Sequence, residues 1–360
     1  MNIQELEGKR IAVLLSGGVD SSVVVYEFAR LGLHPDCFYI KIGPKEKEDW
    51  DCNSEEDLEM ATLVTRRFGC KLQVIDCHKE YWDKVTRYTM EKVKAGFTPN
   101  PDVMCNRLIK FGAFNEKMGH DYDLIATGHY AQTEWIDGRK WLTTSPDPVK
   151  DQTDFLAQIY DWQLKKAIFP IGHYEKNEVR EIAERENLIN AHRKDSQGIC
   201  FLGNIDYNEY VRRYLGEQIG DVIELETGKK IGEHKGLWFH TIGQRKGLGL
   251  GGGPWFVIKK DVTKNILYVS HGYDPATAYK KDFSLHDFHF LTEGITTLPE
   301  QITFKIRHTP EYHPATIEQL PDGRCIIHSA ERIHGVAPGQ FCVVYDEHHH
   351  RCFGSGEITI

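Results

Sequence analysis

The sequence predicts an α/β unit with a doubly wound parallel sheet, followed by two β-rich units. Over residues 1 to about 130, buried apolar runs alternate with amphipathic helical patterns, which is typical of a parallel sheet with helices on both faces. From Asp221 onward, short strands alternate with turns rich in Gly, Pro and Asp, as in small barrels or sandwiches. The length of 360 residues also exceeds that of one small domain.

The composition is that of an ordinary globular protein, with 40% hydrophobic and 27% charged residues. The sequence contains no apolar run long enough to span a membrane, and its N-terminus lacks the basic region and apolar core of a secretory signal. The nine cysteines form no C-x-x-C pair, so we expect reduced thiols in a cytoplasmic protein. A net charge of −9 does not indicate a general polyanion binder.

The first buried strand, residues 10–15, ends in the glycine turn Ser16-Gly17-Gly18. A helix is predicted to follow it to about Arg30, with Asp20-Ser21-Ser22 as its caps. A strand, glycine turn and helix leave free backbone N–H groups at a positive helix end, where phosphate commonly binds. The loop is neither the G-x-x-x-x-G-K-[ST] nor the G-x-G-x-x-G type. A capped glycine turn without a ligand is the alternative interpretation.

The other elements follow from periodicity and turn residues. Strands are predicted at residues 36–41, 71–75 and 123–127, and helices at residues 55–68, 80–94, 155–168, 176–187 and 207–214. Asp137-Gly138 predicts a type I′ hairpin over residues 133–143. Later strands are predicted at residues 236–242, 255–258, 265–270, 303–307, 324–328 and 340–345. Ser16, Lys41 and Gly128 all follow or end predicted parallel strands, so we expect them at one site.

A second informative segment spans residues 98–107. Its prolines favour an extended entry, and the apolar spacing after Arg107 predicts a helix. Cys105 near this helix start, with Arg107 and Lys110 close by, is expected to have a lowered thiol pKa and to be a nucleophile. Asp102 could transfer protons. A small buried cysteine is an equally open interpretation of Cys105, and it is the better interpretation of Cys200 when that residue is taken alone.

Six segments together resemble the bacterial tRNA 2-thiouridylases, the MnmA/TrmU family of the ATP pyrophosphatase (PP-loop) superfamily. In chain order, they read Ser-Gly-Gly-Val-Asp-Ser-Ser, Asn-Pro-Asp-x-x-Cys-Asn, Ala-Thr-Gly-His-Tyr, Lys-Asp-Gln, Asp-Ser-x-Gly-Ile-Cys-Phe and His-Thr-Ile-Gly-Gln-Arg-Lys-Gly-Leu-Gly. The resemblance implies a PP-loop catalytic domain over residues 1–203, a central β-rich tRNA-contacting domain over 204–280 and a C-terminal β-barrel over 281–360. Gln197 and His308 depart from the threonine and tyrosine usual in the family.

The resemblance also implies a role for each matching residue. ATP would be bound by Leu14, Leu15, Ser16, Gly17, Gly18, Val19, Asp20, Ser21, Ile40 and Gly128. Asp20 would hold Mg²⁺ through the ATP phosphates, and no permanent prosthetic group is expected. The target base would be surrounded by Asn100, Pro101 and Asp102, the last acting as acid or base. Other tRNA contacts would come from His129, Lys150, Asp151, Gln152, Arg307, His308 and Gln340.

The reaction implied by the resemblance is ATP-dependent 2-thiolation of the wobble uridine in Lys, Glu and Gln tRNAs. AMP transfer to the uracil C2 oxygen would create a leaving group. Cys200 would carry sulfur as a persulfide, supplied by a cysteine desulfurase or a sulfur-carrier protein. Cys105 would attack, leaving a transient Cys105–Cys200 disulfide. Reaching the base requires flipping it out, which costs little in an unpaired anticodon loop.

Two other functions remain open from the sequence. An adenylating ligase or amidotransferase acting on a small metabolite would share the Ser-Gly-Gly-x-Asp-Ser loop, but it would need neither Cys105 nor Cys200. An RNA-binding protein that kept the fold without catalysis would bind tRNA but not cleave ATP. The intact loop and both cysteines argue against this last possibility.

Overall fold

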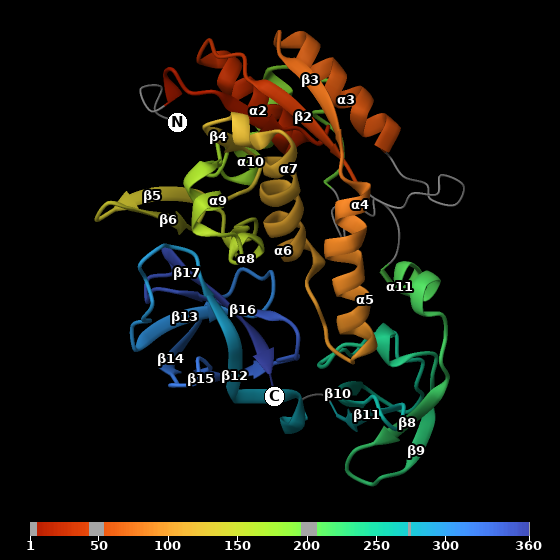
Figure 1. Cartoon of the computed structure of the whole chain (residues 1–360). Coiled ribbons are helices and arrows are strands. Elements are labelled where there is room, and N and C mark those ends of the chain that lie inside the picture. The colour runs from red at the N-terminus through yellow and green to blue at the C-terminus, as the bar shows by residue number, and fades with distance from the viewer. Residues whose placement is uncertain (1–5, 43–53, 196–206, 273–274, 360) are drawn as a thin grey trace.

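The computed structural model describes residues 6–42, 54–195, 207–272 and 275–359. Figure 1 shows three units: an α/β unit that contains both the red-to-orange strands and the yellow-green helices, a blue barrel below it, and a green β-rich unit beside the barrel. Within the described ranges, no helix is both long and apolar enough to cross a membrane.

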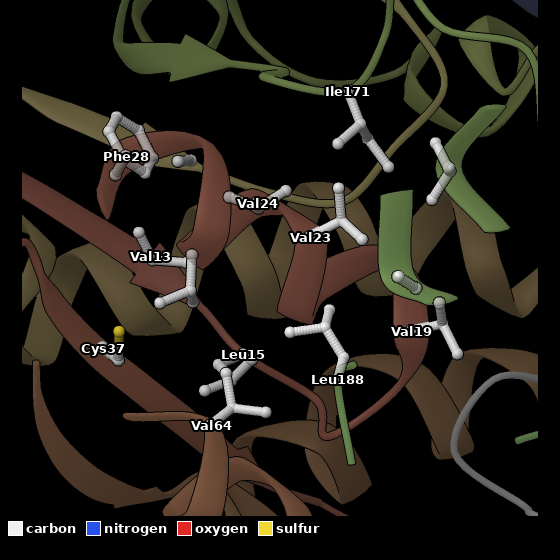
Figure 2. Close-up of a cluster of buried hydrophobic side chains, with 14 of the residues drawn as sticks. Val13, Leu15, Val19, Val23, Val24, Phe28, Cys37, Val64, Ile171 and Leu188 are labelled. Atoms are coloured by element: carbon white, nitrogen blue, oxygen red, sulfur yellow. The ribbon is translucent and has the colours of Figure 1, made fainter. Parts of the chain in front are cut away.

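The α/β unit contains a parallel sheet with strand order β3-β2-β1-β4-β7. Its strands are β1 (Ile11–Leu14), β2 (Asp36–Lys41), β3 (Lys71–Asp76), β4 (Leu124–Ala126) and β7 (Ala167–Ile168). One face is covered by α2 (Val19–Arg30), α3 (Ser54–Arg67) and α10 (Lys176–Arg185). Figure 2 shows this core, where Val13 and Leu15 meet Val23 and Val24 of α2. Because helices also cover the opposite face, as described next, the prediction of a doubly wound sheet is confirmed.

The opposite face packs against two interrupted helices, with Ala12 of β1 pointing to this side. The first comprises α4 (His78–Tyr81), the π-helical η1 (Trp82–Thr86) and α5 (Arg87–Lys94). The second comprises α6 (Pro101–Cys105), the π-helical η2 (Asn106–Ala113), α7 (Phe114–Lys117) and the 3-10 turn η3 (Gly119–Asp121). π-helical turns are uncommon and occur frequently at functional sites.

The central unit is a four-stranded sheet with order β10-β11-β8-β9. It contains β8 (Gly220–Glu224), β9 (Lys230–His234), β10 (Trp255–Asp261) and β11 (Ile266–His271), with the 3-10 turns η4 (Leu237–Phe239) and η5 (Ala276–Ala278) at its sides. The helix α11 (Tyr207–Leu215) leads into it and packs Tyr210 and Val211 against Met90 and Val93 of α5.

The C-terminal unit is a six-stranded antiparallel barrel, closed by the pairing of β12 with β17. Its strands are β12 (Tyr279–Phe290), β13 (Gln301–Lys305), β14 (His313–Gln319), β15 (Cys325–His334), β16 (Phe341–Tyr345) and β17 (Arg351–Thr359). The hairpin formed by β5 (Gln132–Ile136) and β6 (Arg139–Thr143) leaves the α/β unit and adds to this sheet through β6 and β17. A core shared by both units results.

Two predicted elements are wrong. The helix predicted over residues 155–168 is divided into α8 (Thr153–Leu156) and α9 (Asp161–Lys166), and its last two residues form β7. They pair with β4, so hydrogen bonding to the sheet replaces the last helical turn. The strand predicted over residues 236–242 contains η4 instead, because Leu237 alone of its apolar residues is fully buried in the central core.

Candidate active site

The loop between β1 and α2 requires a glycine at Gly17 and starts the helix without a side-chain cap. Gly18 is the N-cap of α2 and has no side-chain cap, so the predicted capping by Asp20-Ser21-Ser22 is wrong. Gly17 adopts a φ of +80°, and a Cβ there would lie 2.2 Å from the backbone oxygen of Asp57. Glycine is therefore required by both backbone conformation and space.

Hydroxyl groups hold this loop in shape. The Ser21 hydroxyl accepts a hydrogen bond from the Ser16 N–H at 3.2 Å, and Ser22 donates to the Gly18 carbonyl at 2.9 Å. Gly128 follows β4, where a Cβ would lie 3.0 Å from the Ser21 nitrogen. The end of β4 thus abuts the start of α2, which brings together two of the predicted ATP-binding segments. Ile40 lies near the end of the adjacent strand β2.

Asp20 belongs to a half-buried charge network that sequence reasoning missed. Its Oδ1 accepts hydrogen bonds from Tyr130 Oη at 2.9 Å and Lys176 Nζ at 2.7 Å. Lys176 also contacts Asp195 at 2.9 Å, and Asp195 is further paired with Lys150 at 3.1 Å. Burial would raise the pKa of Asp195, but hydrogen bonds and charge from Lys176 and Lys150 lower it to about 2. The only local sequence feature that could have indicated this network is the position of Lys176 at the first residue of α10.

A second set of supports reaches the loop from the opposite side. Asn190 donates to the Gly17 carbonyl at 2.7 Å and to Ser22 Oγ at 2.8 Å. Arg193 pairs with Asp57 at 2.6 Å, next to the same glycine. Because these residues lie far from the loop in sequence, no local pattern indicated them.

The second predicted segment forms α6. Asn100 caps this helix by accepting hydrogen bonds from the Asp102 and Val103 N–H groups. Cys105 lies in the second turn and is only 3% exposed, packed in a small core with Cys77 and Ile109. The cysteine is therefore near the helix start, as expected, but it is covered by protein.

The two cations expected beside Cys105 have other partners. The Arg107 guanidinium donates to Gln158 Oε1 at 2.7 Å and lies 4.3 Å from the Tyr160 ring centroid. Lys110 Nζ lies 3.5 Å from His129 Nε2. The lowered thiol pKa of Cys105 stays a prediction.

A small pocket brings together residues predicted from separate motifs. Asn100 from the α6 entry, Arg307 and His308 after β13, and Gln340 before β16 line one cavity of about 120 Å³. A cavity of ~150 Å³ can hold one six-membered ring. The Gln340 Oε1 is buried and has no hydrogen-bond partner within the described part of the chain. At about 120 Å³ the pocket is somewhat smaller than such a cavity but approaches the size of one ring, and it presents an unused acceptor.

The cationic wall of this pocket is held in place by the barrel. Arg307 donates to the Gly335 carbonyl at 2.7 Å, and burial lowers its pKa. His308 Nδ1 lies 3.2 Å from Asp154 Oδ2, and its ring is 4.8 Å from that of Phe155. Barrel and α/β unit thus build the pocket jointly.

Other predicted tRNA contacts are placed differently. Asp151 is completely buried, and its carboxylate accepts hydrogen bonds from the Ser145 N–H and the Thr153 hydroxyl. His129 is 7% exposed and lies 2.7 Å from Thr127 Oγ1. Both side chains are enclosed by protein in this structure, and their contact with tRNA stays a prediction. Gln152 accepts a hydrogen bond from the Tyr130 N–H. Lys150, whose side chain is 36% exposed, pairs with Asp195.

Cys200 lies outside the described residues, and of its motif only Asp195 is described. This range of described residues ends at Asp195, whose carboxylate is paired with Lys176 and Lys150.

Three family models match the chain in succession. Residues 9–204 match a tRNA methyl transferase HUP domain, residues 208–271 a tRNA methyl transferase PRC-barrel domain, and residues 280–358 an aminomethyltransferase β-barrel domain.

Curated relatives match over nearly the full length. A tRNA-specific 2-thiouridylase MnmA 1 from Bacteroides thetaiotaomicron is 59% identical over 97% of this chain and 99% of its own. The tRNA-specific 2-thiouridylases MnmA of Parabacteroides distasonis and Porphyromonas gingivalis are each 56% identical over 97% of this chain, covering 98% and 99% of their own lengths.

Proposed function

Because the chain belongs to the tRNA-specific 2-thiouridylase family, we propose that it thiolates the wobble uridine of tRNA by a sulfur relay through Cys105 and Cys200. The family activity makes the chain an ATP-using enzyme that converts a tRNA uridine to 2-thiouridine. The ligase alternative is not favoured, because full-length relatives carry the thiouridylase name.

The loop of residues 16–18 and the start of α2 would bind the ATP phosphates through backbone N–H groups at the helix N-terminus. Asp20 offers one carboxylate for Mg²⁺, an ion that keeps several waters and phosphate ligands and needs few from the protein. Its Oδ1 is already engaged by Lys176 and Tyr130, so Oδ2 would be the ligand. The described ranges contain no group of three or more His, Cys, Asp or Glu side chains arranged to hold a metal.

The single observation that carries the substrate assignment is the pocket formed by Asn100, Arg307, His308 and Gln340. It approaches the size of one ring and is lined from both α6 and the barrel. A uridine flipped out of an anticodon loop would enter it. Asp102 and Cys105 lie on the helix that begins at the pocket wall.

The proposed chemistry proceeds in balanced steps. ATP transfers AMP to the uracil C2 oxygen and releases pyrophosphate. Sulfur then attacks C2 in one of two ways. Either the outer sulfur of the Cys200 persulfide bonds to C2, and Cys105 then attacks Cys200 and breaks the bond between the two sulfurs, or Cys105 attacks the persulfide first and frees sulfide, which bonds to C2. AMP departs with the oxygen. The Cys105–Cys200 disulfide that remains must take two electrons from a reductant before another cycle. The sulfur donor would be a cysteine desulfurase or carrier protein, and Lys, Glu and Gln tRNAs would be the substrates.

The test combines protein, unmodified tRNA transcript, ATP, Mg²⁺ and a persulfide source, and follows AMP and 2-thiouridine by mass spectrometry. Cys105→Ala and Cys200→Ala should both lose persulfide-driven product. Cys77→Ala is the matched control, because Cys77 is buried in the same small core as Cys105. AMP formation without tRNA, equal in all variants, would instead establish the ligase.

A further inference from the structure

A second and larger pocket adjoins the first. It has a volume of about 400 Å³ and lies between α5, α6 and the barrel, which run alongside one another in Figure 1. Phe341 lines both pockets. Val103 contributes to the first pocket and Met104 to the second, so consecutive residues of α6 face the two cavities.

Aromatic side chains form one part of the wall of this second pocket, and Met104, Arg107, Gln158, Asp287 and Glu357 form the rest. Tyr88, Phe288, His289 and Phe341 line it. Phe288 lies where the pairing of β12 with β17 shifts register between His286 and His289. Such a bulge redirects side chains and is over-represented next to active sites. Unpaired RNA bases are bound by stacking on aromatic rings, which tolerate any base.

Polar groups in the wall suit the edge of a base. Arg107 and Glu357 lie in the wall, where Arg107 already donates to Gln158 and Glu357 is paired with Lys92. The Tyr88 hydroxyl and the Arg107 Nε are buried without hydrogen-bond partners in the described chain. The His289 ring donates from Nε2 to the Ile159 carbonyl at 2.7 Å. Burial lowers the pKa of His289, so its neutral ring keeps Nδ1 as an acceptor.

We propose that this second pocket binds the unpaired tRNA base next to the target uridine. The inference rests on the proposed function and adds a subsite to it. When the target base is flipped into the first pocket, its neighbour loses a stacking partner. A ring-lined cavity across a shared Phe341 would restore stacking for that neighbour and hold the backbone in the flipped geometry.

The test measures binding of synthetic anticodon stem–loops by filter retention. One RNA carries all bases, and two others lack the base 5′ or 3′ of the target uridine. Wild-type protein should lose about tenfold affinity when one of these bases is missing, because a stacked base contributes strongly to binding. Phe288→Ala should bind the complete RNA about tenfold more weakly and lose little more when that base is absent.

Phe290→Ala is the matched control, because Phe290 contacts the Phe288 ring at 4.9 Å but is not among the pocket residues. It should keep the wild-type sensitivity. Phe288→Leu replaces the alanine variant if that variant does not fold. The pocket proposal would be overturned if wild-type affinity did not change when either base is missing. It would also be overturned if Phe288→Ala and the missing base lowered affinity by independent factors. Thiolation would continue in both cases, so the proposed function would stand. Failure to bind any tRNA would overturn both proposals.

Discussion

Lys176 Nζ lies 2.7 Å from Asp20 Oδ1 and 2.9 Å from Asp195. The Lys176 ammonium group therefore joins Asp20, which follows the glycine turn, to Asp195, which is the first residue of the Cys200 motif. The Lys176 side chain, at the start of α10, is 11% exposed, whereas the Asp20 and Asp195 side chains are 32% and 35% exposed. We infer that Lys176 fixes both carboxylates in the orientation that ATP binding requires.

Lys176→Met should reduce AMP release at least tenfold and lower the melting temperature, because Asp20 would lose its cation and Asp195 would keep only Lys150 and Arg180. Lys176→Arg should recover part of both. The control is Lys165→Met, whose ion pairs with Asp161 and Glu293 are exposed and contribute little to stability. Equal effects at the two lysines would refute the bridging role. Calorimetry measures the melting temperature of each variant, and an AMP-release assay measures its activity.

Gly17→Ala should abolish ATP-dependent activity, since its Cβ would collide with the Asp57 backbone. Gly138→Ala separates this clash from the cost of positive φ, because Gly138 has a φ of +73° with nothing within 4 Å. The control should lose only about 1 kcal/mol of unfolding free energy and remain active. ATP affinity and denaturant unfolding distinguish the two variants, and an active Gly17→Ala enzyme would contradict the prediction.

Asn100→Ala should lower the free energy of unfolding by about 1 kcal/mol, because the N-cap of α6 is lost. Asn100→Ser keeps a cap but removes the amide from the pocket. If the amide contacts the base, the serine variant should be stable yet thiolate slowly. Full activity of Asn100→Ser would show that capping is its sole role.

Stability should fall as pH drops below about 6.5, in part through His129. Burial, and then the nearby Lys110 charge, lower the pKa of His129 well below its usual value. The unfolded chain then takes up a proton that the folded chain refuses, so acid favours unfolding. His129→Gln should reduce the loss between pH 6.5 and 5 by about 2 kcal/mol. Urea unfolding at both pH values measures this, and parallel pH profiles would exclude the effect.

Local patterns in the sequence predicted the strand, glycine turn and helix at Ser16 because each depends on neighbouring residues. The same holds for the Asp137-Gly138 hairpin, where both residues adopt positive φ. The Lys176–Asp20 pair lies beyond such patterns, because its partners are 156 positions apart. The buried positions of Asp151 and His129 also depend on tertiary packing, so a motif match could not reveal them.

The sequence also did not predict which distant strands pair with one another. The hairpin was predicted, but its joining to β17 was not, because pairing with a distant strand leaves no periodic trace in either segment. β7 has only two residues, too few for a pattern, and its neighbours favour helix. Sequence thus located the chemistry-bearing segments, and the packing of the barrel against the α/β unit determined which of them meet.

The joining of β6 to β17 has a consequence for synthesis in the cell. Ser355 of β17 donates to the Ala157 carbonyl, 198 positions earlier in the chain, and side chains from both units share one core. At a translation rate of ~5–20 residues per second, the α/β unit would wait on the order of ten seconds or more for this strand. During that interval its uncovered apolar surface would be a substrate for chaperones.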